Sequence, residues 1–324
     1  MNERLFRTQF NQMETTEKQA LMESLATRYD MTFLGLHTSD RWGQSSTTGI
    51  FEKDGREYVF VPGDTVTLGW ERFAVGLDQD SREELDYLFQ EWEMEQDPEE
   101  MIRESMAPVR QAAIGPMLVG RELEELCWEP VTMADPRLTA HPDWLKKFRE
   151  FAWSDLDSLT MHQSARIERT EKGFQICIYN RTDYDELLAG LEKQGLSLPT
   201  ADEWAYLCGG GCRTLFPWGD GMDYSMHLHW FEDMEEDEDR PYDMEEPNFF
   251  GLSIAYDPYM REIVKAEQFT TCGGDGGCNI CGGMGMFLGY LPCSPHCKPE
   301  VQEDKELNGD YDFCRPIIRV EMDG

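Results

Sequence analysis

Cationic residues are scarce in this chain of 324 residues. Lysine and arginine together number 29, against 64 aspartates and glutamates, and the formal net charge at pH 7 is −35. Nucleic acids and anionic membranes are bound mainly through cationic side chains, so this balance argues against both as partners. Such an acidic surface favours solubility, and its overall field attracts cations and basic peptides.

Long apolar runs are also missing. No stretch approaches the roughly 20 apolar residues of a membrane-spanning helix. The opening residues, MNERLFRTQF, carry charges but lack the apolar core and small-residue cleavage site of a secretory signal. We therefore expect a cytoplasmic protein, and the hydrophobic content of 40% and aromatic content of 12% predict a globular one.

Cysteine, by contrast, is plentiful. The chain has ten cysteines, and eight of them lie after position 207. Thiols of a cytoplasmic protein stay reduced, which argues against a framework of structural disulfides. The clustering instead indicates metal binding or thiol chemistry in the C-terminal third of the chain.

Residues 198–220, LPTADEWAYLCGGGCRTLFPWGD, predict a capped helix followed by an aromatic turn. Thr200 is placed as the N-cap residue, and Glu203, three residues later, completes a capping box. The glycines at 209–211 end the helix, because glycine takes positive φ values without steric cost. Phe216-Pro217-Trp218 then supplies large aromatic side chains for packing.

This stretch resembles the signature of the formylglycine-generating enzyme (sulfatase-modifying factor) family, in which LPT-x-x-EW is followed by a glycine-rich exit and PWG. Residues 247–252, PNFFGL, resemble the family's PNxFGL. Residues 310–320 resemble its closing strand, LGFRxVR, with Arg315 as the arginine. The resemblance thus extends in the same order over most of the chain.

The resemblance implies an α+β fold with the irregular, C-type-lectin-like architecture of this family over residues 57–324. Residues 57–71 resemble its opening strand pair, with a turn at Pro62-Gly63. Residues 1–56 would then form a helical and strand extension, and an acidic helical insertion would interrupt the domain at about 80–107.

Other local patterns predict further elements. In chain order these are a helix from Thr16 to Tyr29, a hairpin turn at Asp54-Gly55, helices at 82–95 and 98–106, a strand pair at 108–120, a helix at 142–152, a hairpin turning near Lys172-Gly173 and a helix starting at Thr182.

Residues 271–299, TCGGDGGCNICGGMGMFLGYLPCSPHCKP, combine cysteine with glycine. In the resembled family, two cysteines of the matching stretch bind copper(I), which activates oxygen to oxidise a substrate cysteine to formylglycine. Cys278 takes the first position, and Cys281, two residues short of the second, is the nearest other thiolate. Soft thiolates select copper(I). The resemblance therefore implies a copper-dependent oxidase acting on a peptide cysteine, with Cys278 and Cys281 as catalytic residues and a substrate groove at Trp218 and Arg315.

The same segment predicts a different site from its spacing. Cys278-x2-Cys281 and Cys293-x3-Cys297 are spaced as in structural zinc sites, and Cys272 is a further candidate ligand. Zinc would hold together a glycine-rich loop that packs poorly by itself. The protein would then be a catalytically degenerate family member that serves as a module for binding a protein partner. Reduced thiols without any metal are a third interpretation. Cys208, Cys212 and His296 are spare candidate ligands.

Two more segments have residues that bind metals. Residues 232–246 hold ten carboxylates, and oxygen ligands suit calcium, although a solvated loop has the same composition. His227 and His229 alternate as on a strand, which would place both imidazoles on one face. For the copper hypothesis we further expect that the 271–299 segment packs against the Trp218 turn and forms one pocket with it.

Overall fold

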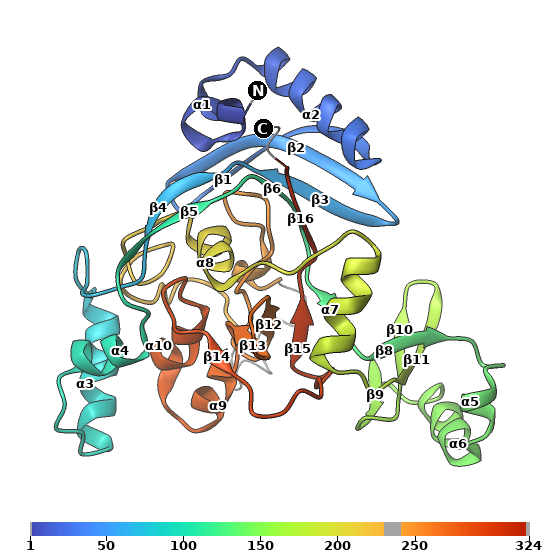
Figure 1. Cartoon of the computed structure of the whole chain (residues 1–324). Coiled ribbons are helices and arrows are strands. Elements are labelled where there is room, and N and C mark those ends of the chain that lie inside the picture. Colours follow the sequence, from blue (N-terminus) through green and yellow to red (C-terminus); the bar gives the residue numbers. More distant parts are fainter. Residues whose placement is uncertain (1, 230–240, 322–324) are drawn as a thin grey trace.

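Helices and strands are interleaved along the whole chain, so the fold is mixed α+β. The computed structural model describes residues 2–229 and 241–321 (Figure 1). Within this part of the chain, the strands form two five-stranded sheets, one four-stranded sheet and one two-stranded sheet. The two five-stranded sheets and the helices packed on them form the body that carries the candidate site.

The first sheet has the strand order β1-β2-β3-β6-β16, and all neighbouring strands are antiparallel. Helix α2 (Thr15–Tyr29) covers one face, and helix α8 (Ala201–Gly209) lies under the other (Figure 1). The strands are β1 (Thr32–Arg41), β2 (Gln44–Lys53), β3 (Arg56–Val61), β6 (Met117–Gly120) and β16 (Ile317–Arg319).

Burial of both faces explains why β3 is apolar at nearly every position. Tyr58 and Phe60 pack in one core with residues of α2, whereas Val59 and Val61 pack in another core with residues of α8. All four side chains are buried. A strand covered on both faces has no polar side, so its sequence shows no alternation.

Of the two turns predicted beside β3, one is confirmed and the other is wrong. Asp54 and Gly55 have φ values of 54° and 79° and join β2 to β3, as a type I′ hairpin turn requires. Pro62-Gly63 does not turn the chain back on itself. β3 pairs with β6, while the next strand, β4 (Asp64–Leu68), pairs with β5 (Arg110–Ile114).

These two pairings continue each other across a bend. Val61 lies opposite Met117 and Asp64 lies opposite Ile114, so two residues intervene on each strand without a change of register. A Cβ on Gly63 would lie 2.7 Å from the carbonyl oxygen of Ile114. This glycine therefore allows a close approach of two bent strands, and the two predicted strand pairs are one long pair.

The second five-stranded sheet, with the order β14-β13-β12-β15-β7, contains a buried ion pair. Arg315 follows β15, and its guanidinium lies 3.1 Å from Glu262 of the parallel neighbour β12. The guanidinium also donates to the carbonyl oxygens of Gly120 and Arg121, where β6 of the first sheet ends. The strands are β7 (Glu124–Glu125), β12 (Arg261–Val264), β13 (Thr270–Cys272), β14 (Glu300–Val301) and β15 (Asp312–Cys314).

Helix α8 has the predicted capping box. Thr200 Oγ1 accepts a hydrogen bond from the Glu203 amide at 3.3 Å, and Glu203 Oε2 accepts one from the Thr200 amide at 2.7 Å. Gly210 ends the helix with a φ of 59°. The Glu203 carboxylate also pairs with Arg319 of β16 at 2.6 Å, so the residue that caps the helix also fixes it to the first sheet.

Residues 247–252 form a tight turn that packs on α8. The Asn248 side-chain amide donates to the Leu207 carbonyl oxygen at 2.8 Å. Its side-chain oxygen accepts hydrogen bonds from the amides of Phe250 at 2.9 Å and Leu252 at 3.3 Å. The two segments with the clearest sequence resemblance therefore bind each other directly.

The acidic insertion predicted at about 80–107 forms two helices, α3 (Gln79–Glu91) and α4 (Pro98–Ser105). Both are amphipathic, because Leu85 and Ile102 are buried in the core to which α8 also contributes. The charged side chains of this segment therefore lie on the outer faces of the two helices.

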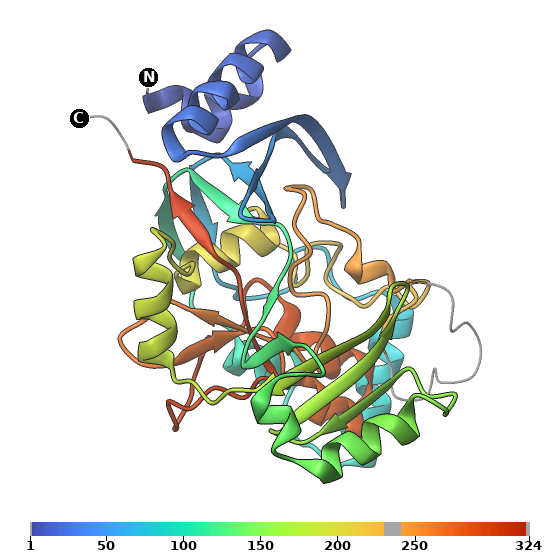
Figure 2. The same cartoon turned by 90° about the vertical axis from the view of Figure 1, so that its right-hand side faces the viewer.

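A lobe that the sequence did not indicate follows β7 (Figure 2). Its four-stranded sheet, with the order β8-β11-β10-β9, packs with Phe148 and Phe151 in a separate core. The hairpin predicted near Lys172-Gly173 joins β10 to β11, and Cys177 in β11 is buried as an apolar residue would be. The elements are β8 (Trp128–Val131), β9 (Ser158–Met161), β10 (Ala165–Thr170), β11 (Gly173–Tyr179), α5 (Pro136–Thr139) and α6 (Pro142–Phe151).

The predicted N-terminal extension, residues 1–56, contributes to the main body, because its strand β2 pairs with β3. Among the described residues, no helix is both long enough and apolar enough to cross a membrane. The remaining helices are α1 (Arg7–Gln12), α7 (Tyr184–Lys193), α9 (Gly276–Cys281) and α10 (Gly285–Tyr290), with 3-10 turns at Asn2–Leu5, Asp243–Glu245 and Leu291–Cys293.

We expect Arg315→Leu to lower the free energy of unfolding by about 3–5 kcal/mol, because Glu262 would remain buried without its partner. Denaturation by guanidinium chloride, followed by tryptophan fluorescence, measures this loss. Arg103→Ala removes an exposed ion pair with Glu99 and is the control, with an expected loss below about 1 kcal/mol. Equal losses in the two variants would contradict the central role of the buried pair.

Candidate functional site

Cys278 and Cys281 open into one surface cavity of about 390 Å³. Helix α9 places them three residues apart, which brings them to one face of the helix. Both side chains are exposed. Sequence reasoning named these two cysteines and Asp275, which directly precedes α9. It did not name the other side chains around them, which come from separate parts of the chain: Tyr259, Arg261, Asn308 and Tyr311.

Two contacts determine the protonation of this cavity. Cys278 Sγ lies 2.8 Å from Asp275 Oδ1, and hydrogen bonding to this carboxylate raises the pKa of the Cys278 thiol. Cys281 Sγ lies 3.7 Å from the Tyr259 hydroxyl. Partial burial, together with this thiol, raises the pKa of Tyr259 to about 12. At neutral pH the cavity therefore presents a protonated Cys278 thiol and a protonated phenol.

The glycines of this segment allow two short helices to pack closely. A Cβ on Gly276 of α9 would lie 1.7 Å from the carbonyl oxygen of Gly289 in α10. A Cβ on Gly277 would lie 2.0 Å from Cδ1 of the Tyr259 ring. The segment predicted as a loop is thus helical at α9 and α10. Its glycines lower the intrinsic helix propensity, so the sequence pattern did not predict these helices.

The other predicted metal ligands lie away from this cavity. Cys272 and Cys293 are buried, and Cys297 Sγ lies 3.7 Å from the carbonyl oxygen of Ser105. Burial raises the pKa of the Cys272 and Cys293 thiols well above the ordinary value and that of Cys297 to about 11. Among the described residues, no three histidine, cysteine or carboxylate side chains are arranged to hold a metal ion. The four thiols of the predicted zinc site, Cys278, Cys281, Cys293 and Cys297, therefore do not line one cavity.

Trp218 lines a different cavity, of about 640 Å³, together with Asp78 and Tyr224. Its ring stacks on Phe216, with centroids 4.7 Å apart, and contacts Trp42 at 5.5 Å. The predicted groove beside Trp218 is therefore separate from the cavity into which the two thiols open.

Arg315, the other residue predicted for the groove, lies in the core. Its side chain has no exposed surface, and it is bonded to Glu262 and to the carbonyl oxygens of Gly120, Arg121 and Ser253. A guanidinium whose donors are all directed to groups inside the protein cannot contact a substrate. The structure thus corrects the assignment of Arg315 from groove residue to core ion pair.

The 271–299 segment does pack against the Trp218 turn, but it does so through α10 and the residues that follow it, not through α9. Phe287 contacts Phe216 at 5.9 Å between ring centroids, and Ser294 Oγ donates to the Leu215 carbonyl oxygen at 2.6 Å. The contact that we expected is present. The single shared pocket is not, since the thiols on α9 and the Trp218 ring line two cavities.

His227 and His229 are neighbours of one aromatic ring and do not lie on a strand. Their rings lie 4.7 and 5.1 Å from that of Tyr242. The His229 ring also contacts the Tyr259 ring at 5.2 Å, and its Nδ1 lies 4.0 Å from Asp257 Oδ2. This histidine is therefore close to the wall of the thiol cavity.

The acidic segment predicted at 232–246 falls largely outside the described residues, which resume at position 241. In its described part, the Asp243 carboxylate accepts a hydrogen bond from the His227 amide at 2.6 Å. Arg41 donates to the backbone carbonyl oxygens of Asp243 and Glu246. Calcium binding here stays a prediction from composition.

Known proteins give no independent assignment. No protein-family model matches the chain, and no curated protein is significantly similar to it. The family resemblance therefore depends on the motifs themselves.

Replacing Asp275 by asparagine tests the protonation of Cys278. Asparagine tolerates the left-handed backbone of this residue (φ 52°) but carries no charge, so the pKa of Cys278 should fall. We expect alkylation of Cys278 by iodoacetamide at pH 8 to be several-fold faster in Asp275→Asn than in the wild type, as measured by peptide mass spectrometry. Alkylation of Cys297 is the internal control. An unchanged rate at Cys278 would contradict the role of Asp275.

His296, a spare ligand candidate, is buried beside the Trp218 turn. Its Nε2 lies 3.0 Å from the Thr214 carbonyl oxygen and 3.9 Å from Cys212 Sγ. Burial lowers the pKa of His296 to about 4. The unfolded chain, in which histidine has its ordinary pKa of about 6.5, binds a proton at pH values where the folded protein does not. Stability should therefore fall as the pH falls from about 6.5 towards 4.

We expect His296 to account for roughly 3 kcal/mol of the stability lost between pH 7 and pH 4. His296→Gln keeps a donor for the Thr214 carbonyl but does not titrate. Its free energy of unfolding, measured by urea denaturation at several pH values, should therefore decline less steeply than that of the wild type. Parallel curves for the two proteins would show that His296 is not the titrating group.

Proposed function

We propose that this protein is a formylglycine-generating-enzyme-like oxidase in which Cys278 and Cys281 bind copper and a cysteine of a peptide is oxidised. One observation carries the proposal: two exposed thiols, three residues apart on one helix, open into the same cavity. The direct bond between Asn248 and Leu207, which joins the two clearest motifs, supports the family's C-type-lectin-like fold as its frame.

The residues of this cavity fit a soft metal ion. Sulfur ligands select copper(I) over hard cations, and Cys278 and Cys281 are the two exposed cysteines of the ten. Metal binding requires thiolates, and the Asp275 carboxylate, 2.8 Å from Cys278 Sγ, can pass the released proton on to solvent and would then remain charged beside the metal ion. Copper bound at these sulfurs would supply the reactivity towards oxygen that the side chains lack.

Other side chains of the cavity can hold a peptide. The Asn308 side-chain oxygen accepts from the Asp310 amide at 3.1 Å, which leaves its NH2 group to donate to a peptide backbone. Arg261 is fixed at the rim by an ion pair with Asp312 at 2.8 Å. The Tyr259 hydroxyl, 3.7 Å from Cys281 Sγ, can donate a hydrogen bond to sulfur. The net charge of −35 favours a substrate with basic residues near its cysteine.

Two differences from the family pattern change the site. Position 283, where the second ligand is expected, is a glycine with a φ of 76°, and Cys281 is the nearest thiol. The family's Ser-Trp pair is replaced by Asp275-Gly276. A tryptophan could not replace Gly276, because the carbonyl oxygen of Gly289 occupies the space of its Cβ. The proposed site therefore has a carboxylate where the family has a hydroxyl, and no side chain where the family has an indole.

The overall conversion determines what the assay must contain. Conversion of a cysteine CH2–SH group to an aldehyde and hydrogen sulfide balances when it consumes one oxygen molecule and two further thiols, which become a disulfide, and releases one water. The reaction mixture therefore includes oxygen, a thiol reductant and a cysteine peptide, and a hydroxylamine probe detects the aldehyde.

We expect protein purified without a metal-binding tag and incubated with copper(I) to retain about one copper per chain and to form aldehyde on the peptide. Cys278→Ser and Cys281→Ser should each abolish both, because one thiolate cannot replace a two-sulfur site. Cys297→Ser is the matched control, since Cys297 lies outside the cavity and should leave copper binding unchanged.

Copper binding without aldehyde formation on any of a set of basic cysteine peptides would contradict the oxidase. Zinc retained in the wild type but lost in Cys297→Ser would instead support the alternative, a degenerate family member with a structural metal site that binds a protein partner.

A further inference from the structure

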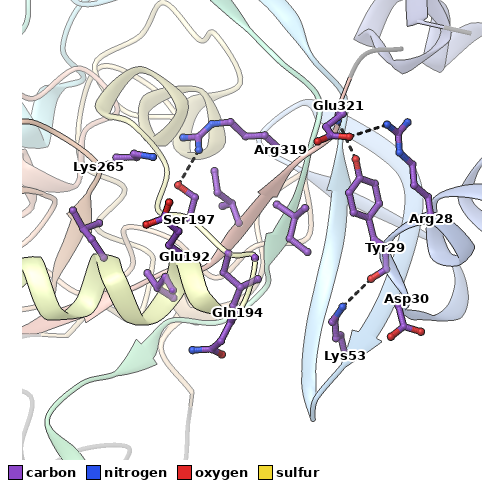
Figure 3. A pocket seen from close by; sticks show the side chains of 16 residues that line it. Arg28, Tyr29, Asp30, Lys53, Glu192, Gln194, Ser197, Lys265, Arg319 and Glu321 are labelled. Carbon is purple, nitrogen blue, oxygen red and sulfur yellow. Dashed lines mark hydrogen bonds and ion pairs between the residues drawn. The ribbon is translucent and has the colours of Figure 1, made fainter. Parts of the chain in front are cut away.

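A cavity of about 640 Å³ lies between α2, α7 and β16, and none of its lining residues belongs to the thiol site (Figure 3). Its apolar lining includes Leu191, Leu196 and Ile317, which are buried. Cavities of this size and partly apolar character are typical of small-molecule sites. Neither the sequence motifs nor the proposed oxidase account for it.

The cavity is rich in cations although the protein is strongly acidic. Four of its sixteen lining residues are lysine or arginine, compared with 29 of 324 in the whole chain. Acidic residues are not enriched, since they number three of sixteen here and 64 of 324 overall. The four cations exceed the three anions of the lining by one, so this cavity lacks the excess of negative charge that the rest of the protein carries.

Two of the four cations are explained by the fold. Arg28 pairs with Glu321 at 3.2 Å, and Lys53 Nζ donates to the Tyr29 carbonyl oxygen at 2.8 Å. Tyr29 is the last residue of α2, where a cation complements the negative end of the helix dipole. These contacts stabilise the end of α2 and need no ligand.

The other two cations, Lys265 and Arg319, are arranged differently. Lys265 is exposed and has no side-chain hydrogen bond or ion pair with any described residue. In Figure 3, its ammonium group and the guanidinium of Arg319 point toward one another. Arg319 is held in place by Glu203 at 2.6 Å and by Ser197 Oγ at 2.9 Å. The charge of Arg319 is therefore already balanced by Glu203, whereas Lys265 is the cation of this cavity that an added anion could pair with.

We propose that this cavity binds an amphipathic organic carboxylate. Its carboxylate lies between Lys265 and the Arg319–Ser197 pair, where a charge-assisted hydrogen bond to the ammonium group is available. Its aliphatic part lies on the apolar lining. The ligand is a monoanion, because Asp30 and Glu321 on the opposite side of the cavity would repel a second negative charge.

Octanoate is the probe, and isothermal titration calorimetry on the full chain is the measurement. We expect Lys265→Gln to weaken octanoate binding about tenfold, as the loss of one charge-assisted hydrogen bond predicts. Glu192→Gln should strengthen it, because this substitution removes a carboxylate that lines the same cavity. Lys305→Gln is the matched control, since Lys305 pairs with Asp185 and does not line the cavity.

Acetate and octylammonium separate the two parts of the ligand. Acetate should bind more weakly than octanoate because it leaves the apolar lining uncovered, and octylammonium should not compete with octanoate. The proposal is overturned if octanoate does not bind the wild type, if octylammonium competes equally well, or if Lys305→Gln weakens binding as much as Lys265→Gln. Copper binding and aldehyde formation play no part in these measurements, so this result is independent of the proposed oxidase.

Discussion

The buried pair of Arg315 and Glu262 determines how the two five-stranded sheets are joined. Glu262 lies in the second sheet and Arg315 directly follows its strand β15, yet the same guanidinium is bonded to the carbonyl oxygens of Gly120 and Arg121, where β6 of the first sheet ends. A buried charge requires that its hydrogen bonds be completed inside the protein. A shift of one sheet against the other would break this set, so the relative position of the sheets is fixed.

This constraint places both candidate sites. Glu262 lies in β12, whose first residue, Arg261, lines the cavity of Cys278 and Cys281, while Lys265, directly after its last residue, lines the cavity between α2, α7 and β16. Both ends of the strand are therefore set by one buried ion pair. Sites positioned by a rigid strand are better preorganised than sites on unsupported loops.

Local signals made part of this fold predictable. The capping box of α8 depends only on residues Thr200 to Glu203, and the Asp54-Gly55 turn depends only on its two residues. Because both signals are local, the sequence was sufficient to predict them, and both predictions were confirmed. Pro62-Gly63 has the composition of a turn, but it bends a strand whose partner lies about fifty residues away, and no local pattern distinguishes the two outcomes. The separate four-stranded lobe was missed for the same reason, because its boundaries depend on which strands pair with each other and not on local composition.

The candidate site was predictable only in its sulfur atoms. Cysteine and glycine in one segment drew attention to Cys278 and Cys281, but Tyr259 and Asn308 carry no motif, and they reach the cavity through long-range packing. Arg315 was misplaced because a conspicuous arginine in a motif was assigned to a substrate, while its burial could not be read from the sequence.

Burial also separates the roles of the ten cysteines. A buried thiol cannot ionise without losing the solvation of its charge, and this raises the pKa of Cys208, Cys272 and Cys293 far above the usual range. These residues serve as small apolar side chains. Cys278 and Cys281 are solvated, yet Asp275 holds Cys278 in its protonated form. Cys278 therefore reacts slowly as a free thiol, because the thiolate is the nucleophile and the metal ligand. In the copper site that we propose, a cation would replace this proton and would be attracted by the same carboxylate, so the charge that slows the reactions of the free thiol would favour a metal ion.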